Sequence, residues 1–409
     1  MATTKQRMLA LSGDEAVAYA VKQVDVDVVA AYPITPQTII VERFSEYVHN
    51  GEVDTEFVCV ESEHSALTAC LAAAATGART FTASASAGLA LMHEILYVTS
   101  GCRAPVVMAV TNRALSAPIN IHCDHADSMV ERDAGWIQIY AENSQEAYDS
   151  LLQGFRIAEH PDILLPTMIM LDAFVLSHTL ENVKVLTDKA VRKFVGTREI
   201  ALVRSHKEAV VPFKLDPENP LTMGPLALYD YYFEHKRQQE EAMRRALKLV
   251  KRIHDEYAEI SGRRYGNGLI DPYRMEDAEI ATICVGSTAG TTKTIVDKLR
   301  ADGVKAGLLR LRTYRPSPKQ DIIKALKSVE AVAVMDRSHS FGAYGGPIFH
   351  EIRHILYDSE TRPQVVDYIY GLGGRDMPPH LIHQIYKDLE EILDTKRVKN
   401  PVQFIGVRE

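Results

Sequence analysis

The chain has 409 residues, of which 46% are hydrophobic and 24% charged, with a formal net charge of −8. This composition is typical of a globular protein of two or three domains, and its acidic balance argues against a nucleic-acid-binding surface. No apolar run reaches the roughly 18 residues that a membrane helix needs, and residues 1–11 lack the apolar core of a signal peptide. We therefore expect a cytoplasmic protein with no nucleic-acid or membrane partner.

Short apolar strands alternate with helices over the first part of the chain. This alternation predicts a parallel, doubly wound sheet. Because the strands are almost continuously apolar, we expect helices on both faces of the sheet. The predicted strands cover residues 26–31, 56–60, 79–83, 105–111, 136–141 and 165–171, and the predicted helices cover residues 13–24, 39–47, 62–76, 86–99 and 144–159.

The pattern fades over residues 188–221, where Pro212, Pro217 and Pro220 indicate a connector. Residues 225–260 then predict a long polar helix, whose apolar stripe at spacings of three and four is typical of packing. A second alternation follows, and we predict an α/β fold of two doubly wound domains, residues 1–225 and 270–409, with a helical linker at 226–269. Its strands are expected at residues 279–285, 304–311, 331–335 and 364–369, and its helices at 288–299, 319–326, 347–356 and 378–393.

A stiff turn, Tyr32-Pro33-Ile34-Thr35-Pro36-Gln37-Thr38, joins the first predicted strand to the following helix. Each proline fixes its own φ and restricts the residue before it. Pro36 suits the first turn of a helix with Thr35 as its N-cap. Thr35 would then lie at the carboxyl end of a strand, where open α/β sheets bind ligands. From this segment alone, a rigid connector with an ordinary cap is an equally good interpretation.

Polar residues also follow three other predicted strands. Because the carboxyl ends of parallel strands share one edge of a sheet, we expect these groups to converge there. They are Glu61-Ser62-Glu63-His64, Ser84 with Ser86, and Asn112-Arg113. Glu63 either favours the start of a helix, a role that Glu61 could equally fill, or faces a cofactor nitrogen. Arg113 either forms a structural ion pair or binds a carboxylate bidentately.

Recognisable phosphate and metal motifs are missing from the sequence. It has no G-x-x-x-x-G-K-[ST], no G-x-G-x-x-G after a strand and no C-x-x-C. The glycine-rich residues 341–347 favour a tight turn over an anion site. His122, Asp124, His125 and Asp127 lack the helical spacing of a zinc site, so loop hydrogen bonding is the favoured interpretation, and we expect no metal ligand on this chain.

Several of these segments together resemble the α chains of 2-oxoacid:ferredoxin oxidoreductases, in particular the pyruvate branch of that family. The resemblance covers nearly the whole chain and is most specific in the long block that starts at Asn112. In the second domain, residues 312–316 and 335–337 resemble the family's transketolase-C-like domain. The segments of the first domain are residues 32–36, 61–64, 88–92 and 112–120, with Asp124, Asp127 and residues 132–136 beyond them.

The resemblance implies that the first domain is a pyrimidine-type thiamine-diphosphate-binding domain. Glu63 would contact the aminopyrimidine of the cofactor, with Pro33, Ile34 and Ser86 as further cofactor contacts. Thr35 and Arg113 would contact the oxoacid. The diphosphate with Mg²⁺, and the 4Fe-4S clusters, would be held by partner β, γ and δ subunits.

The implied activity is the reversible oxidative decarboxylation of pyruvate with coenzyme A, giving acetyl-CoA, carbon dioxide and electrons for ferredoxin. Ala87 stands where pyruvate enzymes commonly carry Gln, so 2-oxobutyrate, 2-oxoglutarate or oxalate remains an alternative substrate. A non-catalytic scaffold paralogue is disfavoured by the joint presence of Thr35, Glu63 and Arg113. A transketolase-like chain, or a β-type chain of a 2-oxoacid dehydrogenase, is disfavoured by residues 112–120.

Overall fold

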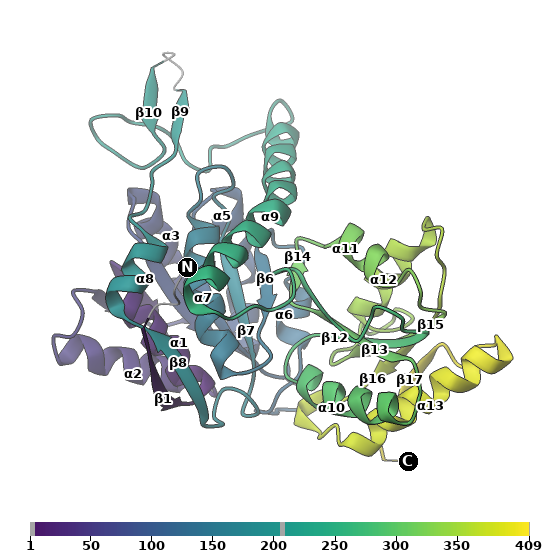
Figure 1. Ribbon diagram of the computed structural model, residues 1–409. Helices are drawn as coiled ribbons and strands as arrows, with labels where there is room; N and C mark the ends of the chain where they lie inside the picture. Colours follow the sequence, from purple (N-terminus) through teal and green to yellow (C-terminus); the bar gives the residue numbers. More distant parts are fainter. Residues whose placement is uncertain (1–4, 205–208, 409) are drawn as a thin grey trace.

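In the computed structural model, which describes residues 5–204 and 209–408, the chain forms two α/β lobes (Figure 1). A seven-stranded sheet, in the order β14-β6-β7-β5-β4-β2-β3, forms the centre of the first lobe. A six-stranded sheet, in the order β11-β13-β12-β15-β16-β17, forms the centre of the second. Over the described part of the chain, no helix is long and apolar enough to cross a bilayer.

The first sheet is parallel except for its edge strand β14, which runs antiparallel to β6. Strands β4 to β7 are buried along their whole length, which confirms the prediction of a sheet covered on both faces. The strands are β2 (Val28–Ala31), β3 (Glu56–Cys59), β4 (Thr80–Ser84), β5 (Val107–Asn112), β6 (Ile137–Tyr140), β7 (Thr167–Asp172) and β14 (Thr313–Arg315).

The helices of the first lobe pack into two hydrophobic clusters. One cluster contains α1, α7 and α9, and the other contains α3 and α5 and continues into the second sheet, so the two lobes share a core. The helices are α1 (Gly13–Val24), α2 (Thr38–His49), α3 (Glu63–Thr76), α4 (Ser86–Leu91), α5 (His93–Gly101), α6 (Ala126–Val130), α7 (Ser144–Ala158), α8 (Asp188–Val195) and α9 (Tyr232–Ser261).

The second sheet is parallel except for β11, which pairs antiparallel with β13. Its strands are β11 (Ile270–Tyr273), β12 (Ile280–Cys284), β13 (Ala306–Leu311), β15 (Ala331–Asp336), β16 (Gln364–Ile369) and β17 (Val402–Phe404). Its helices are α10 (Thr288–Ala301), α11 (Lys319–Ala325), α12 (Pro347–Tyr357), the short 3-10 turn η1 (Leu372–Gly374) and α13 (Pro379–Thr395).

Several segments differ from the sequence-based expectation. The helix expected over residues 86–99 is two helices, α4 and α5, which meet at Met92. The expected connector contains α8 and a protruding hairpin of β9 (Leu202–Arg204) and β10 (Val210–Pro212) (Figure 1). Strand β1 (Gln6–Leu11), which was not predicted, pairs antiparallel with β8 (Glu181–Leu186). Such pairings join residues far apart in the sequence and are not visible in local periodicity.

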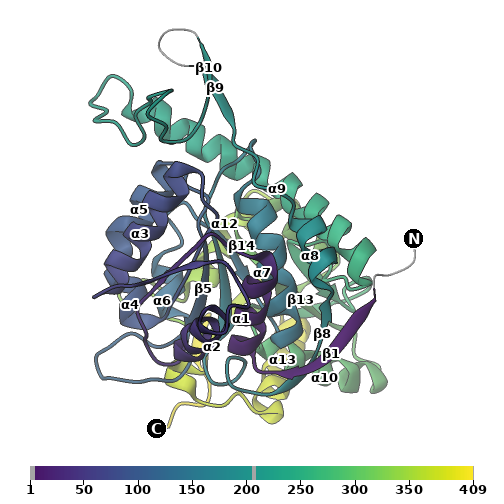
Figure 2. The ribbon, with the colours of Figure 1, turned by 90° about the vertical axis from the view of Figure 1, so that its left-hand side faces the viewer.

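Helix α9 packs as part of the first lobe rather than as a free spacer between lobes. It runs along the outside of that lobe (Figure 2), and Val250, Ile253 and Tyr257 of its apolar stripe are buried in the cluster with α1 and α7. This confirms that the stripe is a packing surface.

Candidate functional site

The polar segments that follow four strands lie along one edge of the first sheet. Strands β3, β2, β4 and β5 are parallel neighbours, so their carboxyl ends lie along the same edge of the sheet. We call this edge the crest. The predicted convergence is confirmed. The crest carries Thr35, Glu61 to His64, Ser84 with Ser86, and Asn112 with Arg113.

Glu63 is the first residue of α3, and only 6% of it is exposed. The helix is capped by Ser62, whose hydroxyl accepts a hydrogen bond from the backbone N–H of Ser65. Glu61, the alternative carboxylate, is exposed and bonds the Ser65 hydroxyl. Within the described ranges, no donor reaches the Glu63 carboxylate. A largely buried residue whose carboxylate has no donor is unusual, which makes Glu63 a better candidate than the exposed Glu61 for contact with a ligand.

Gly88 of α4 lies directly against this carboxylate. A Cβ at position 88 would be 2.5 Å from Oε1 of Glu63 and 2.7 Å from Oγ of Ser84. The Ser84 hydroxyl is buried and has no hydrogen-bond partner among the residues described. Only a residue without a side chain fits here, so glycine lets α4 pack directly against the Glu63 carboxylate and the unpaired Ser84 hydroxyl.

Gly88→Ala is expected to destabilise the protein by about 1–3 kcal/mol, because the new methyl group would force Glu63 or Ser84 out of position. Gly290→Ala is the matched control, since its Cβ would meet only Glu142 Oε1 at an ordinary 3.6 Å, inside α10. Helix propensity predicts an unchanged or slightly higher free energy of unfolding for this control. Denaturant unfolding of both variants measures the difference, and equal stabilities would contradict the close packing at Gly88.

Two backbone carbonyls fix the guanidinium group of Arg113. Nε donates to the carbonyl of Asn120 and Nη1 donates to the carbonyl of Thr35, both at 2.9 Å. In the part of the chain that the structure describes, Nη2 has no acceptor and no carboxylate pairs with Arg113, so the structural ion pair is not formed there. The exposed Thr35 hydroxyl likewise has no partner within those ranges. Arg113 therefore presents an oriented cation at the crest, next to a free hydroxyl.

The turn after β2 differs from its prediction. Helix α2 begins after Gln37, so Thr35 is not its N-cap and Pro36 is not in its first turn. The Gln37 side-chain amide donates to the carbonyls of Tyr32 (2.9 Å) and Ala83 (3.2 Å), which closes the turn and ties it to β4. These bonds displace the helix start, and Thr35 is held through its backbone carbonyl rather than through its hydroxyl.

The remaining expected cofactor contacts divide into two kinds. Pro33 is exposed and Ile34 is half-buried, so both can touch a ligand. Ser86 is buried, and its hydroxyl donates to the carbonyl of Ala114 at 2.5 Å. Its φ of 48° lies in the left-handed region, which is uncommon for a residue with a side chain. The polar groups of Ser86 are thus used to join the loops after β4 and β5.

Asp127 connects these loops and was not predicted as a site residue. Its Oδ2 accepts hydrogen bonds from the backbone N–H groups of Ser86 (2.9 Å) and Arg113 (3.0 Å), and Oδ1 accepts one from Nδ2 of Asn112 (2.8 Å). Burial raises the pKa of Asp127 to about 6, although these hydrogen bonds oppose the shift. The loop hydrogen bonding expected around residues 122–127 is confirmed, but its partners are not apparent from the sequence.

A second buried cluster lies between the lobes. Cys123, His125 and Asp172 place potential ligand atoms within 4.8 Å of one another. Asp172 is already engaged, because His125 Nε2 lies 2.8 Å from Oδ1 and Arg337 Nη1 lies 3.1 Å from Oδ2. Burial opposes ionisation of Asp172, yet His125 and Arg337 together hold its pKa below the usual value. This arrangement fits an ion pair between the lobes.

A cavity of about 740 Å³ opens beside the crest. Residues 114–132 of the first lobe line one side, and residues 338–347 and 372–373 of the second lobe line the other. Asn120, whose carbonyl holds Arg113, is part of its wall. The crest therefore adjoins a space large enough for a small-molecule ligand.

Comparison with known proteins is consistent with this site. The family described as pyruvate flavodoxin/ferredoxin oxidoreductase, thiamine-diphosphate-binding, matches residues 19–255, and pyruvate:ferredoxin oxidoreductase core domain II matches residues 278–382. The chain is 49% identical to pyruvate synthase subunit PorA of Thermotoga maritima and 47% identical to PorA of Methanocaldococcus jannaschii, each over 98% of both chains.

A solved 2-oxoglutarate:ferredoxin oxidoreductase from Magnetococcus marinus, with 2-oxoglutarate, coenzyme A and succinyl-CoA bound, has the same fold with a TM-score of 0.73. The alignment covers 93% of this chain and 65% of that chain, at 17% identity, which supports the fold alone. The two family matches and the near full-length identities lead to one assignment. The chain belongs to the pyruvate flavodoxin/ferredoxin oxidoreductase family.

Proposed function

We propose that the chain is the α subunit of a pyruvate:ferredoxin oxidoreductase complex. The complex would convert pyruvate and coenzyme A reversibly to acetyl-CoA and carbon dioxide, with the electrons passing to ferredoxin. The observation that carries this proposal is 49% identity to a pyruvate synthase subunit over 98% of both chains. The unpaired carboxylate of Glu63 and the oriented cation of Arg113 at one crest support a catalytic rather than a scaffold role.

The Glu63 carboxylate suits the aminopyrimidine end of thiamine diphosphate. Glu63 is largely buried and receives no hydrogen bond from the described residues, and Gly88 packs against one side of its carboxylate. When bound, thiamine diphosphate supplies the carbon nucleophile for attack on a keto group. The Glu63 carboxyl would hold a proton in hydrogen-bond contact with a ring nitrogen and return it, as a general acid and base in a pocket with little water. Pro33 and Ile34 would pack against the ring.

Arg113 and Thr35 are the proposed contacts of the oxoacid. The Arg113 guanidinium is fixed through Nε and Nη1, which leaves Nη2 to bind a carboxylate oxygen in a charge-assisted hydrogen bond. The Thr35 hydroxyl would donate to the same substrate. Because two carbonyls orient the guanidinium before substrate arrives, little side-chain entropy is lost on binding.

We assign the remaining functions of the complex to partner chains. The sequence has neither a phosphate-binding motif nor a C-x-x-C, so a β subunit would hold the diphosphate with Mg²⁺, and partner subunits would hold the 4Fe-4S clusters. Residues 1–225 with α9 would form the pyrimidine-type domain, and residues 270–409 the transketolase-C-like domain. Strand β14 would then belong to the second domain in sequence but pair with the sheet of the first domain.

The substrate is tested in the complex reconstituted with its β, γ and δ subunits. Coenzyme-A-dependent reduction of ferredoxin would be compared for pyruvate, 2-oxobutyrate, 2-oxoglutarate and 2-oxoisovalerate, and oxalate, which leaves no acyl group, would be tested without coenzyme A. We expect the highest kcat/KM for pyruvate and no turnover by the isolated chain, because half of the cofactor site is missing from it. Ala87 stands where a Gln is common in pyruvate enzymes, so a preference for 2-oxobutyrate would revise the substrate, and failure with every acid would overturn the function.

A further inference from the structure

We propose that Asp127 is a positioning residue. Its hydrogen bonds, here called the frame, hold the loop after β4 on the cofactor side and the loop after β5 on the substrate side in a fixed relative position. This inference rests on the proposed function, because Glu63 and Arg113 are the groups that it positions. Asp127 is 1% exposed and lies just inside α6, away from the crest residues in sequence. It touches neither ligand, so any effect on the reaction is transmitted through its hydrogen-bond partners.

The substrate side depends on the first hydrogen bond. Oδ2 of Asp127 accepts from the backbone N–H of Arg113 at 3.0 Å, at the point where the chain leaves β5. Oδ1 accepts from Nδ2 of Asn112 at 2.8 Å, so two successive residues are anchored to one carboxylate. The direction in which the Arg113 guanidinium leaves the backbone is thereby fixed.

The cofactor side depends on the same oxygen. Oδ2 also accepts from the backbone N–H of Ser86 at 2.9 Å, which stabilises the left-handed φ of 48° at that residue. Ser86 begins α4, and two residues later Gly88 packs against the Glu63 carboxylate. A shift at Ser86 would move Gly88 and with it the surface against which the Glu63 carboxylate packs.

Every described partner of the Asp127 carboxylate is a donor. Ser86 and Arg113 donate to Oδ2, and Asn112 and the backbone N–H of Ser128 donate to Oδ1. An asparagine amide has only one acceptor oxygen. Whichever way the amide is turned, its NH₂ group faces two donors, so Asp127→Asn disrupts the frame with almost no change in volume.

Ionisation of the Asp127 carboxyl is unfavourable at this buried position. Among the residues described, no cation forms an ion pair with Asp127, and the neighbouring carboxylate of Asp124 adds to the effect of burial in raising its pKa to about 6. Cys123 and Tyr140 are the other titratable groups that face it, and both are buried with raised pKa values. Because the folded pKa is raised, the ionised form costs the native state free energy above that pH. We therefore expect that the ionised Asp127 carboxylate serves to hold the loops after β4 and β5 in the geometry that the site needs.

The test uses the reconstituted complex carrying Asp127→Asn. We expect the KM for pyruvate and the Kd for thiamine diphosphate, measured by calorimetry, each to rise about tenfold, as for the loss of one or two buried hydrogen bonds. The KM for coenzyme A should change little, and the Tm of the complex should fall by a few degrees, because the amide leaves buried donors unpaired. Glu131→Gln is the matched control, because Glu131 is equally buried nearby but bonds His93, and it should leave all four values unchanged.

A double variant separates positioning from general damage. If Asp127 acts through Arg113, Asp127→Asn should raise the KM for pyruvate no further in an Arg113→Ala background. Additive effects, or an unchanged KM and Kd in Asp127→Asn, would overturn the proposal. If Asp127→Asn does not assemble, Asn112→Ala removes one partner and should raise the KM about threefold, and an unchanged KM would again overturn it. A wild-type complex that is inactive with pyruvate refutes the proposed function instead, and the Kd for thiamine diphosphate still tests Asp127.

Discussion

Glu63→Gln is expected to lower the kcat of the assembled complex by about 10²–10⁴-fold, the range typical of removing a general acid or base. Glutamine has nearly the shape of glutamate, so its packing against Gly88 is retained and the fold should be unchanged. The amide, however, cannot hold and return a proton at the cofactor ring. The loss is therefore expected mainly in kcat, with a smaller effect on the KM for pyruvate.

Glu61→Gln is the matched control for this prediction. Glu61 lies two residues earlier, is exposed and bonds only the Ser65 hydroxyl among the residues described. Initial rates of ferredoxin reduction, with thiamine diphosphate at saturating concentration, should be near normal for this control. A Glu63→Gln complex with more than about a tenth of normal kcat would show that another group moves the proton, since even the weakest general base contributes more than this.

The crest could be predicted because it follows from simple rules of strand order. Apolar runs such as residues 105–111 predicted parallel strands, and polar residues after each run then had to lie on the same edge. This rule predicts Glu61 to His64 and Asn112-Arg113 at the crest, where the structure has them, whereas the choice of Glu63 over Glu61 rests on the family resemblance. Helix starts were predicted less well, because the expected N-cap Thr35 does not cap α2, and Ser62, which was expected inside a helix, caps α3.

Contacts between distant segments could not be predicted in this way. Asp127 reaches Ser86 across 41 residues, and no periodicity or motif indicates that hydrogen bond. The same holds for Thr35, because the carbonyl that Arg113 binds lies 78 residues from it in the sequence. Strand β14 is a further example, since it follows β13 of the second sheet but pairs with β6 of the first.

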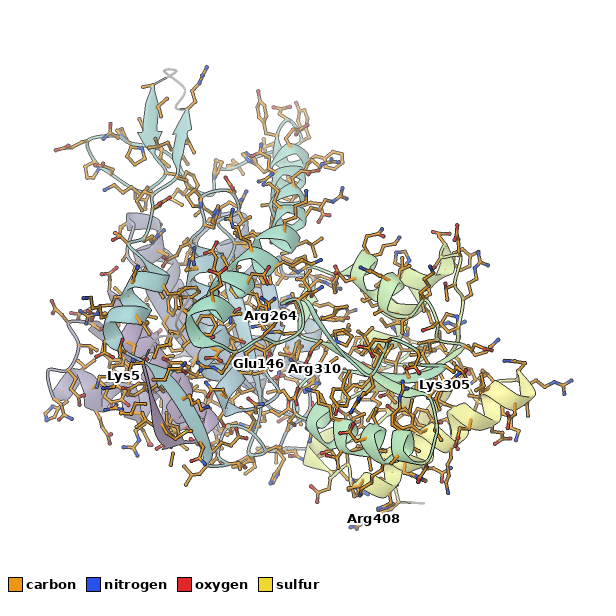
Figure 3. The ribbon with its side chains drawn as sticks, viewed as in Figure 1. Lys5, Glu146, Arg264, Lys305, Arg310 and Arg408 are labelled. Carbon is orange, nitrogen blue, oxygen red and sulfur yellow. The ribbon has the colours of Figure 1, made fainter. Side chains whose placement is uncertain are left out.

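A buried ionic network joins the two lobes next to strand β14. Glu146 of α7 accepts hydrogen bonds from Arg310 Nη1 (2.7 Å) and Arg312 Nε (2.8 Å), and all three side chains are fully buried. Figure 3 shows Glu146 and Arg310 close together where the lobes meet. Burial raises the pKa of Glu146, but the two guanidinium groups outweigh this effect and lower the pKa below its usual value. Glu146 therefore stays ionised between two cations that have left water.

Glu146→Gln is expected to destabilise the protein by about 3–5 kcal/mol, because among the described residues it leaves buried Arg312 without a counter-ion, while Arg310 keeps Glu142 and Asp271, both at 3.2 Å. The pH dependence has a defined sign. The depressed pKa means that the stabilisation by Glu146 is present above the usual glutamate value of 4.5 and is lost as the pH falls through the lower folded value. The stability difference between wild type and variant should therefore be constant from pH 8 to about pH 5 and shrink below it.

Glu142→Gln provides a comparison with a partly solvated carboxylate of the same network. Glu142 lies one turn before Glu146 and pairs with Lys293 at 2.7 Å and with Arg310 at 3.2 Å, but its side chain is 12% exposed and the lysine is 25% exposed. Its loss should cost about 1 kcal/mol, because Lys293 is partly solvated and Arg310 keeps Glu146 and Asp271. Denaturant unfolding followed by circular dichroism would measure both variants. Equal costs for the two would mean that water reaches Arg310 and Arg312, and that apolar packing rather than the ionic network holds β14 in the first sheet.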